Sequence, residues 1–154
     1  MDTIDIRLLD ELQRDSSQSL DEMSEKVGLS RNACWRRMRQ LEDAGIIKGR
    51  VALLDAEKLG VGLTVMISVR TSHHDLAWLE RFRGAVNSIP EIIAAYRTTG
   101  DVDYLLQAVV PNVRAYDLLY KALIAAVPLS DVSSFFVMET LKATTCLPLK
   151  HIRL

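Results

Sequence analysis

Apolar residues in the first third of the chain recur at helical spacing. Ile4, Leu8, Leu9 and Leu12 place one apolar stripe on a helix that an Asp2 cap begins and that ends at about Arg14. A second helix is predicted from Ser19 and Glu22, which form a capping-box pattern, to Gly28, a residue that favours helix ends.

A third helix follows at the spacing of a helix-turn-helix. Ser30 can cap it only three residues after Val27, the last apolar position of the second helix. Cys34, Met38 and Leu41 then share its inward face, so the opposite face is free for other contacts. After Gly45, residues 46–54 are β-rich and interrupted by glycine, which predicts the strands of a wing.

The remaining two thirds of the chain show strand and helix periods in alternation. Gly60 and Gly62 mark a hinge, and two helices stopped by Pro90 and Pro128 alternate with strands. The predicted strands are Leu63–Val69, Ile92–Thr98, Tyr104–Val110 and Val132–Met138, with a trailing strand at Leu141–Leu147. The helices are predicted to be buried through Leu76, Leu79, Phe82 and Val86, and through Tyr116, Leu119, Leu123 and Ile124.

This order predicts an α+β chain with two domains. Residues 1–52 form a winged helix-turn-helix, residues 53–62 a hinge, and residues 63–154 a ferredoxin-like βαββαβ domain. With both helices on one face of the sheet, we expect the other face to carry apolar strand residues that pair with a second copy in a two-fold dimer. Those expected residues are Val65, Ile67, Val69, Leu106, Ala108 and Val110.

Charge changes this picture locally. Lys and Arg number 19 against 20 Asp and Glu, so bulk charge cannot attract nucleic acid. The segment from Lys26 to Leu41, however, has five basic residues and no acidic one. An isolated basic helix is usually a solvated face, but its place after a capped helix and a short turn favours double-stranded DNA as the partner.

The third helix supplies the expected DNA contacts. Arginine forks bind guanine edges and asparagine pairs with adenine, so the predicted base readers are Arg31, Asn32, Arg36 and Arg39. The predicted backbone contacts are Ser30, Trp35, Arg37, Lys48 and Arg50. Arg37 and Trp35 flank the buried stripe, so Arg37 either binds phosphate or supports the fold, and Trp35 packs or contacts a sugar.

A polar loop between the middle strands has two interpretations. A tight turn alone explains Gly100 and one aspartate. Two acids, two threonines and a glycine near a dimer interface also suit a zwitterion, with Asp101 or Asp103 accepting from its ammonium group and threonine hydroxyls donating to its carboxylate. Residue chemistry leaves both open.

Other chemistry is sparse. His73, His74, His151 and the cysteines form no metal-ligand spacing, so we expect no metal, no cofactor and no catalytic residue. Cys34 at a helix start could sense redox state, although its inward position favours a small buried apolar residue. The acidic N-terminus and the lack of a long apolar run predict no signal peptide and no membrane span. The sparse cysteines indicate a reducing compartment, and with DNA as the expected partner we expect a cytoplasmic, nucleoid-associated protein.

The whole chain resembles the Lrp/AsnC (leucine-responsive/asparagine-related) transcription regulators. The likeness is carried by Asp5–Leu12, by Leu29, Ser30, Cys34, Arg37, Met38, Leu41, Glu42, Gly45 and Ile47, by Leu53–Leu63 and by Gly100–Tyr104. It implies dimers that often form octamers, and an amino-acid effector site at the subunit interface. That site is expected at Thr98, Thr99, Gly100, Asp101, Asp103 and Tyr104. The variant at residues 33–35 is similar to a subgroup that regulates amino-acid breakdown. An effector-free, DNA-architectural protein of the same fold remains the alternative.

Overall fold

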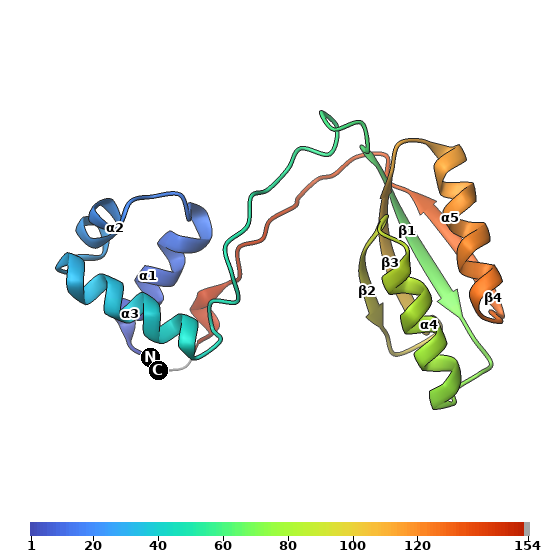
Figure 1. The fold of residues 1–154 in the computed structure, drawn as a ribbon, viewed down its shortest axis with the longest axis horizontal. Coiled ribbons are helices and arrows are strands. Elements are labelled where there is room, and N and C mark those ends of the chain that lie inside the picture. Colours follow the sequence, from blue (N-terminus) through green and yellow to red (C-terminus); the bar gives the residue numbers. More distant parts are fainter. Residues whose placement is uncertain (153–154) are drawn as a thin grey trace. The chain divides into compact units, whose positions relative to one another are not determined.

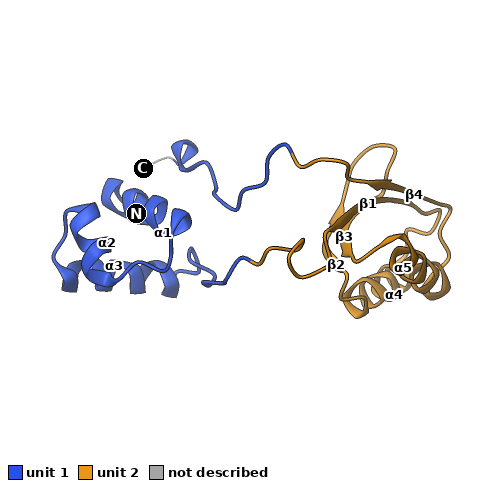
Figure 2. Ribbon diagram, turned by 90° about the horizontal axis from the view of Figure 1, so that it is seen from above, with its two compact units in different colours: residues 1–53, 141–154 blue, residues 54–140 orange. Residues whose placement is uncertain are grey.

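The computed structural model describes residues 1–152, which form two compact units. One unit comprises Met1–Leu53 and the C-terminal segment from Leu141 onward, and the other comprises Leu54–Thr140, coloured separately in Figure 2. The chain therefore passes between the units twice.

The first unit contains the three predicted helices: α1 (Thr3–Arg14), α2 (Leu20–Val27) and α3 (Arg31–Asp43) (Figure 1). Asp2, Ser19 and Ser30 cap them as expected, and Gly28 ends α2 at a φ of 72°. The helices enclose a core of buried apolar residues: Leu8, Leu9, Met23, Val27, Cys34 and Leu41. The helix-turn-helix prediction is confirmed.

The strands predicted for the wing are absent. Among the described residues, none from 46 to 54 belongs to a strand. The backbone N–H groups of Ile46 and Ile47 instead donate to the Leu41 carbonyl, at 3.0 and 3.2 Å. The prediction was wrong because β-rich composition does not supply the partner strand that a ladder needs.

The second unit is a four-stranded antiparallel sheet covered by two helices. The strands are β1 (Leu63–Arg70), β2 (Ile92–Arg97), β3 (Tyr104–Val110) and β4 (Asp131–Phe136), in the order β2-β3-β1-β4. The helices are α4 (Leu76–Ser88) and α5 (Val113–Ala126), and Figure 2 shows both on one side of the sheet. This is the predicted βαββαβ arrangement.

The covered face of this sheet is not the one expected. Val65, Ile67, Val69, Leu106, Ala108 and Val110 are almost fully buried, in one cluster with Trp78 and Phe82 of α4 and Leu119 and Leu123 of α5. The prediction that they line the open face was therefore wrong. By strand register, the open face carries Met66, Gln107 and Phe135 in one row and Tyr96, Leu105 and Ser68 in the next. Alternation separates two faces but does not say which one the helices cover.

The buried stripe of α4 is rotated from the predicted one. Leu76 is 79% exposed, whereas Trp78, Phe82 and Ala85 are buried. Trp78 offers more apolar area than Leu76, and its indole N–H donates to the Pro128 carbonyl at 2.8 Å. On α5, Ile124 is likewise exposed, while Leu119 and Leu123 are buried as predicted.

The trailing strand predicted at residues 141–147 does not form. These residues belong to the first unit, where the backbone of Leu147 binds the side chain of Gln13 on α1. A short 3-10 helix follows at Leu149–His151, and Leu149 packs against the core of the first unit.

Candidate nucleic-acid interface and ligand-binding loop

Helix α3 presents a polar face because its apolar residues hold the opposite face in the core. Cys34 and Leu41 are buried, and the Ser30 hydroxyl accepts the Ala33 N–H at 3.3 Å at the helix start. Asn32 and Arg36 are exposed. Trp35 is 57% exposed, so its ring is available for a sugar or base contact.

Three of the six basic residues predicted to contact DNA form exposed ion pairs. Arg31 pairs with Asp21 at 3.4 Å, and Arg39 with Glu42 at 3.4 Å and Asp43 at 3.8 Å. Arg50 pairs with Glu42 at 2.9 Å. Exposed pairs of this kind contribute about 0 to 1 kcal/mol, so a phosphate can displace the carboxylate. Lys48 is exposed as well.

Arg36 differs from the three paired arginines. Its side chain is exposed in the middle of α3, and no ion pair within residues 1–152 includes it. Its guanidinium can therefore bind a ligand without first breaking an ion pair with a carboxylate. This makes Arg36 the best-placed base reader of the predicted set.

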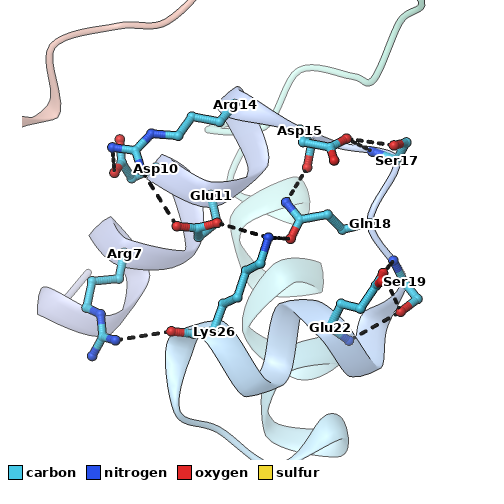
Figure 3. Close-up of polar contacts among 10 residues, drawn as sticks. All are labelled: Arg7, Asp10, Glu11, Arg14, Asp15, Ser17, Gln18, Ser19, Glu22 and Lys26. Atoms are coloured by element: carbon cyan, nitrogen blue, oxygen red, sulfur yellow. Dashed lines mark hydrogen bonds and ion pairs between the residues drawn. The ribbon is translucent and has the colours of Figure 1, made fainter.

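Lys26 belongs to the basic run but serves the helix packing. Its ammonium group donates to the Gln18 side-chain oxygen at 2.6 Å and lies 3.7 Å from the Glu11 carboxylate of α1. Figure 3 shows both contacts. The Lys26 carbonyl also accepts from the guanidinium of Arg7 at 3.2 Å (Figure 3). Lys26 thus joins α1 to α2, and the positive charge free for DNA lies further along the chain.

Arg37 also points into the unit. Its Nη1 atom donates to Asp5 Oδ1 at 2.7 Å and to Asp2 Oδ2 at 2.8 Å, both at the start of α1. These hydrogen bonds, that to Asp5 first, raise the pKa of the Arg37 guanidinium. Of the two roles that the sequence left open for Arg37, the contacts favour support of the fold. The two aspartates were missed as partners because an acid at a helix start is already explained by capping.

The polar loop divides into a structural part and an exposed part. Gly100 has a φ of 107°, and the Thr98 N–H and hydroxyl bind the Asp103 and Val102 carbonyls. The Asp103 carboxylate accepts the Thr71 N–H at 2.8 Å. Tyr104 is buried, its ring 4.6 Å from that of Phe82. Thr99 and Asp101 are exposed. Thr98, Asp103 and Tyr104 therefore hold a turn that presents Thr99, Gly100 and Asp101.

Other reactive chemistry is limited in the described chain. Burial raises the pKa of the Cys34 thiol, the opposite of what a redox sensor needs. Residues 1–152 contain no cluster of three metal-ligating side chains. No helix among them is long and apolar enough to cross a membrane.

Two family models match the two parts of the chain. Residues 1–48 match a winged helix-turn-helix DNA-binding model, and residues 64–147 match the Lrp/AsnC ligand binding domain. The glutamate uptake regulatory protein of Zymomonas mobilis is 51% identical over 149 residues, which cover 97% of this chain and 91% of that protein.

Solved structures agree over the full length. An AsnC family transcriptional regulator from Agrobacterium tumefaciens has a TM-score of 0.95 and 47% identity, covering 99% of this chain and 100% of that one. A transcriptional regulator of Neisseria meningitidis, solved in complex with L-Met, has a TM-score of 0.93 and 37% identity, covering 98% of each chain. The chain therefore belongs to the Lrp/AsnC family, and it is a DNA-binding transcription regulator with a ligand-binding domain rather than an enzyme.

Proposed function

We propose that α3 is the recognition helix of this regulator and lies in the major groove. Its exposed face supplies Arg31, Asn32, Arg36 and Arg39 for base edges. Ser30, Trp35, Lys48 and Arg50 contact the DNA backbone. The observation that carries this assignment is the exposed Arg36 guanidinium, which has no acidic partner in the described part of the chain.

The second domain binds a small amino acid at the loop from Thr98 to Tyr104. Asp101 accepts from the ammonium group, while the Thr99 hydroxyl and the backbone N–H groups beside Gly100 donate to the carboxylate. Both side chains are exposed on a turn that Thr98, Asp103 and Tyr104 keep in shape. The L-Met complex of the Neisseria relative supports an amino acid as the ligand class. The hinge at residues 53–62 connects this domain to the DNA-binding domain.

A homodimer forms through the open face of the sheet. Phe135 and Tyr96 are 60% and 57% exposed there, and Met66 and Leu105 lie between them in the register. A second sheet is the simplest cover for such a face, and two-fold symmetry matches two half-sites about one DNA turn apart. Dimers can assemble further into octamers, which sedimentation velocity distinguishes by mass. The protein acts in the cytoplasm, on the nucleoid.

The experiment measures affinity for the DNA upstream of the protein's own gene, at fixed salt, with each of the twenty amino acids added separately. We expect one amino acid to shift the affinity. Arg36→Ala should lower specific affinity by about 1 to 3 kcal/mol and relax one operator position. Arg83→Ala, the same charge change at an exposed position on α4, is the matched control and should leave affinity unchanged.

Two outcomes contradict parts of this proposal. Equal losses for Arg36→Ala on specific and random DNA would remove Arg36 from the base readers. Tight specific binding that no amino acid alters would favour the effector-free architectural function.

A further inference from the structure

The start of α1 and the middle of α3 are joined by a compact cluster of three charged residues. Asp2 and Asp5 form a reciprocal capping box: Asp2 Oδ1 accepts the Asp5 N–H at 2.9 Å, and Asp5 Oδ2 accepts the Asp2 N–H at 2.8 Å. One oxygen of each carboxylate thus accepts a hydrogen bond of the cap. The other oxygen of each binds Arg37 Nη1, at 2.8 and 2.7 Å.

Burial distinguishes the Asp5–Arg37 pair from the surface ion pairs, whereas Asp2 is 52% exposed. The side chain of Asp5 is 13% exposed and that of Arg37 is 26% exposed, whereas the arginines of the Arg31 and Arg39 pairs are 65% and 61% exposed. A less exposed pair is screened less by solvent and salt, and its geometry is held more firmly. The contact spans 32 residues of sequence, from Asp5 to Arg37, so it fixes one helix against another.

The position of Arg37 on α3 gives this contact a consequence for DNA. Arg37 directly follows Arg36, the arginine of the exposed face for which residues 1–152 supply no ion pair. A rotation or shift of α3 on α1 would move the Arg36 guanidinium, and a bidentate contact to a base edge tolerates little displacement. Contacts to the phosphate backbone tolerate a larger displacement.

We propose that Arg37 is a positioning residue for sequence readout: held by the α1 capping box of Asp2 and Asp5, it sets the orientation of α3 and does not bind DNA. The inference rests on the proposed role of α3 as the recognition helix. Of the two roles that the sequence left open for Arg37, it excludes the phosphate contact.

The two roles of Arg37 predict opposite effects for a substitution on α1. Asp5→Asn removes a negative charge next to the recognition helix, so electrostatics alone, or an Arg37 freed to bind phosphate, would raise DNA affinity. If Asp5 acts by holding Arg37, the same substitution loosens α3 and lowers specific affinity, by about tenfold. Asp10→Asn is the matched control: it makes the same charge change on α1, at an exposed pair with Arg14 (Figure 3), and should not lower affinity.

Salt dependence distinguishes a positioning role of Arg37 from a phosphate contact. We expect Arg37→Ala to lower specific affinity about tenfold, to change affinity for random DNA by less than about twofold, and to leave the slope of log affinity against log salt unchanged. Loss of a phosphate contact would instead reduce that slope by about 0.9. Asp2→Asn and Asp5→Asn are near-isosteric, so they carry the test if Arg37→Ala fails to fold by circular dichroism.

The outcomes separate this inference from the proposed function. Tighter binding by Asp5→Asn, or a reduced salt slope for Arg37→Ala, would show that Arg37 binds DNA and would overturn the inference. If Arg36→Ala leaves specific binding intact, α3 is not the recognition helix and the proposed function itself is wrong. A loss of specificity in both Arg36→Ala and Asp5→Asn, with Asp10→Asn unaffected, supports both.

Discussion

The side chain of Gln13 binds the backbone of Leu147 in both directions. Its Nε2 donates to the Leu147 carbonyl at 3.0 Å and its Oε1 accepts the Leu147 N–H at 2.8 Å. One amide thereby gives an extended segment the pair of hydrogen bonds that a neighbouring strand would provide. The segment from Leu141 onward is thus a structural part of the DNA-binding unit.

Removing this amide should weaken the DNA-binding unit. We expect Gln13→Ala to lower the free energy of unfolding by about 1 kcal/mol, because two exposed hydrogen bonds are lost. A stop codon after Thr140, which also removes the packing of Leu149, should cost more. Differential scanning calorimetry measures both, and Gln40→Ala, at an exposed glutamine on α3, is the control. A truncated chain as stable as the full chain would contradict the structural role.

The two aspartates of the polar loop should separate in function. Asp101→Ala should abolish any response to an amino acid and leave basal DNA binding intact, because Asp101 is exposed and supports no described contact. Asp103→Ala should lower stability by about 1 to 2 kcal/mol, because it removes the acceptor for the Thr71 N–H. Calorimetry with and without the effector distinguishes the loss of the amino-acid response in Asp101→Ala from the loss of stability in Asp103→Ala. Loss of the dimer in Asp101→Ala would show that this residue is structural.

Cys34 should behave as a packing residue. Because burial raises its pKa, the thiol stays protonated at neutral pH and reacts slowly with iodoacetamide. Mass-spectrometric peptide mapping should find the half-exposed Cys146 labelled first. Cys34→Ala should leave DNA affinity unchanged while costing about 1 to 2 kcal/mol of stability. Rapid labelling of Cys34 that changes DNA affinity would revive redox sensing.

Helix caps should make stability depend on acid pH. Backbone hydrogen bonds lower the pKa of Asp2 at α1, of Glu22 at α2 and of Asp75 at α4. A carboxyl whose pKa is lower in the folded state stabilises it above the unfolded pKa, and that stabilisation is lost as pH falls through the folded pKa. The thermal midpoint should therefore drop between about pH 5 and pH 2. Asp75→Asn still caps α4 but cannot titrate, so it should flatten the curve. If Asp75→Asn left the dependence of the thermal midpoint on pH unchanged, the Asp75 cap would not contribute to it.

Local pattern was sufficient for helices α1 to α5, strands β1 to β4 and their order, but not for the strands predicted at residues 46–54 and 141–147, which do not form. The caps Asp2, Ser19 and Ser30, the inward stripe of α3 and the two strand-helix-strand repeats were all predicted correctly, because capping and periodicity depend on residues a few positions apart. The exposed polar face of α3 follows from the same stripe. The sequence alone therefore determined the fold class and pointed to α3 as the helix that we propose binds DNA.

The tertiary structure decided which partner each ambiguous residue took. Arg37 binds Asp5, which is 32 residues away in sequence, and Gln13 binds Leu147, which is 134 residues away. The Asp103 carboxylate accepts a hydrogen bond from Thr71 rather than remaining free for a ligand. Packing also determines which face of the sheet the helices cover, and it buries Trp78 of α4 in place of the predicted Leu76. These outcomes depend on the relative energies of contacts between segments that are distant in sequence. The local periodicity of apolar residues gives no information about those energies.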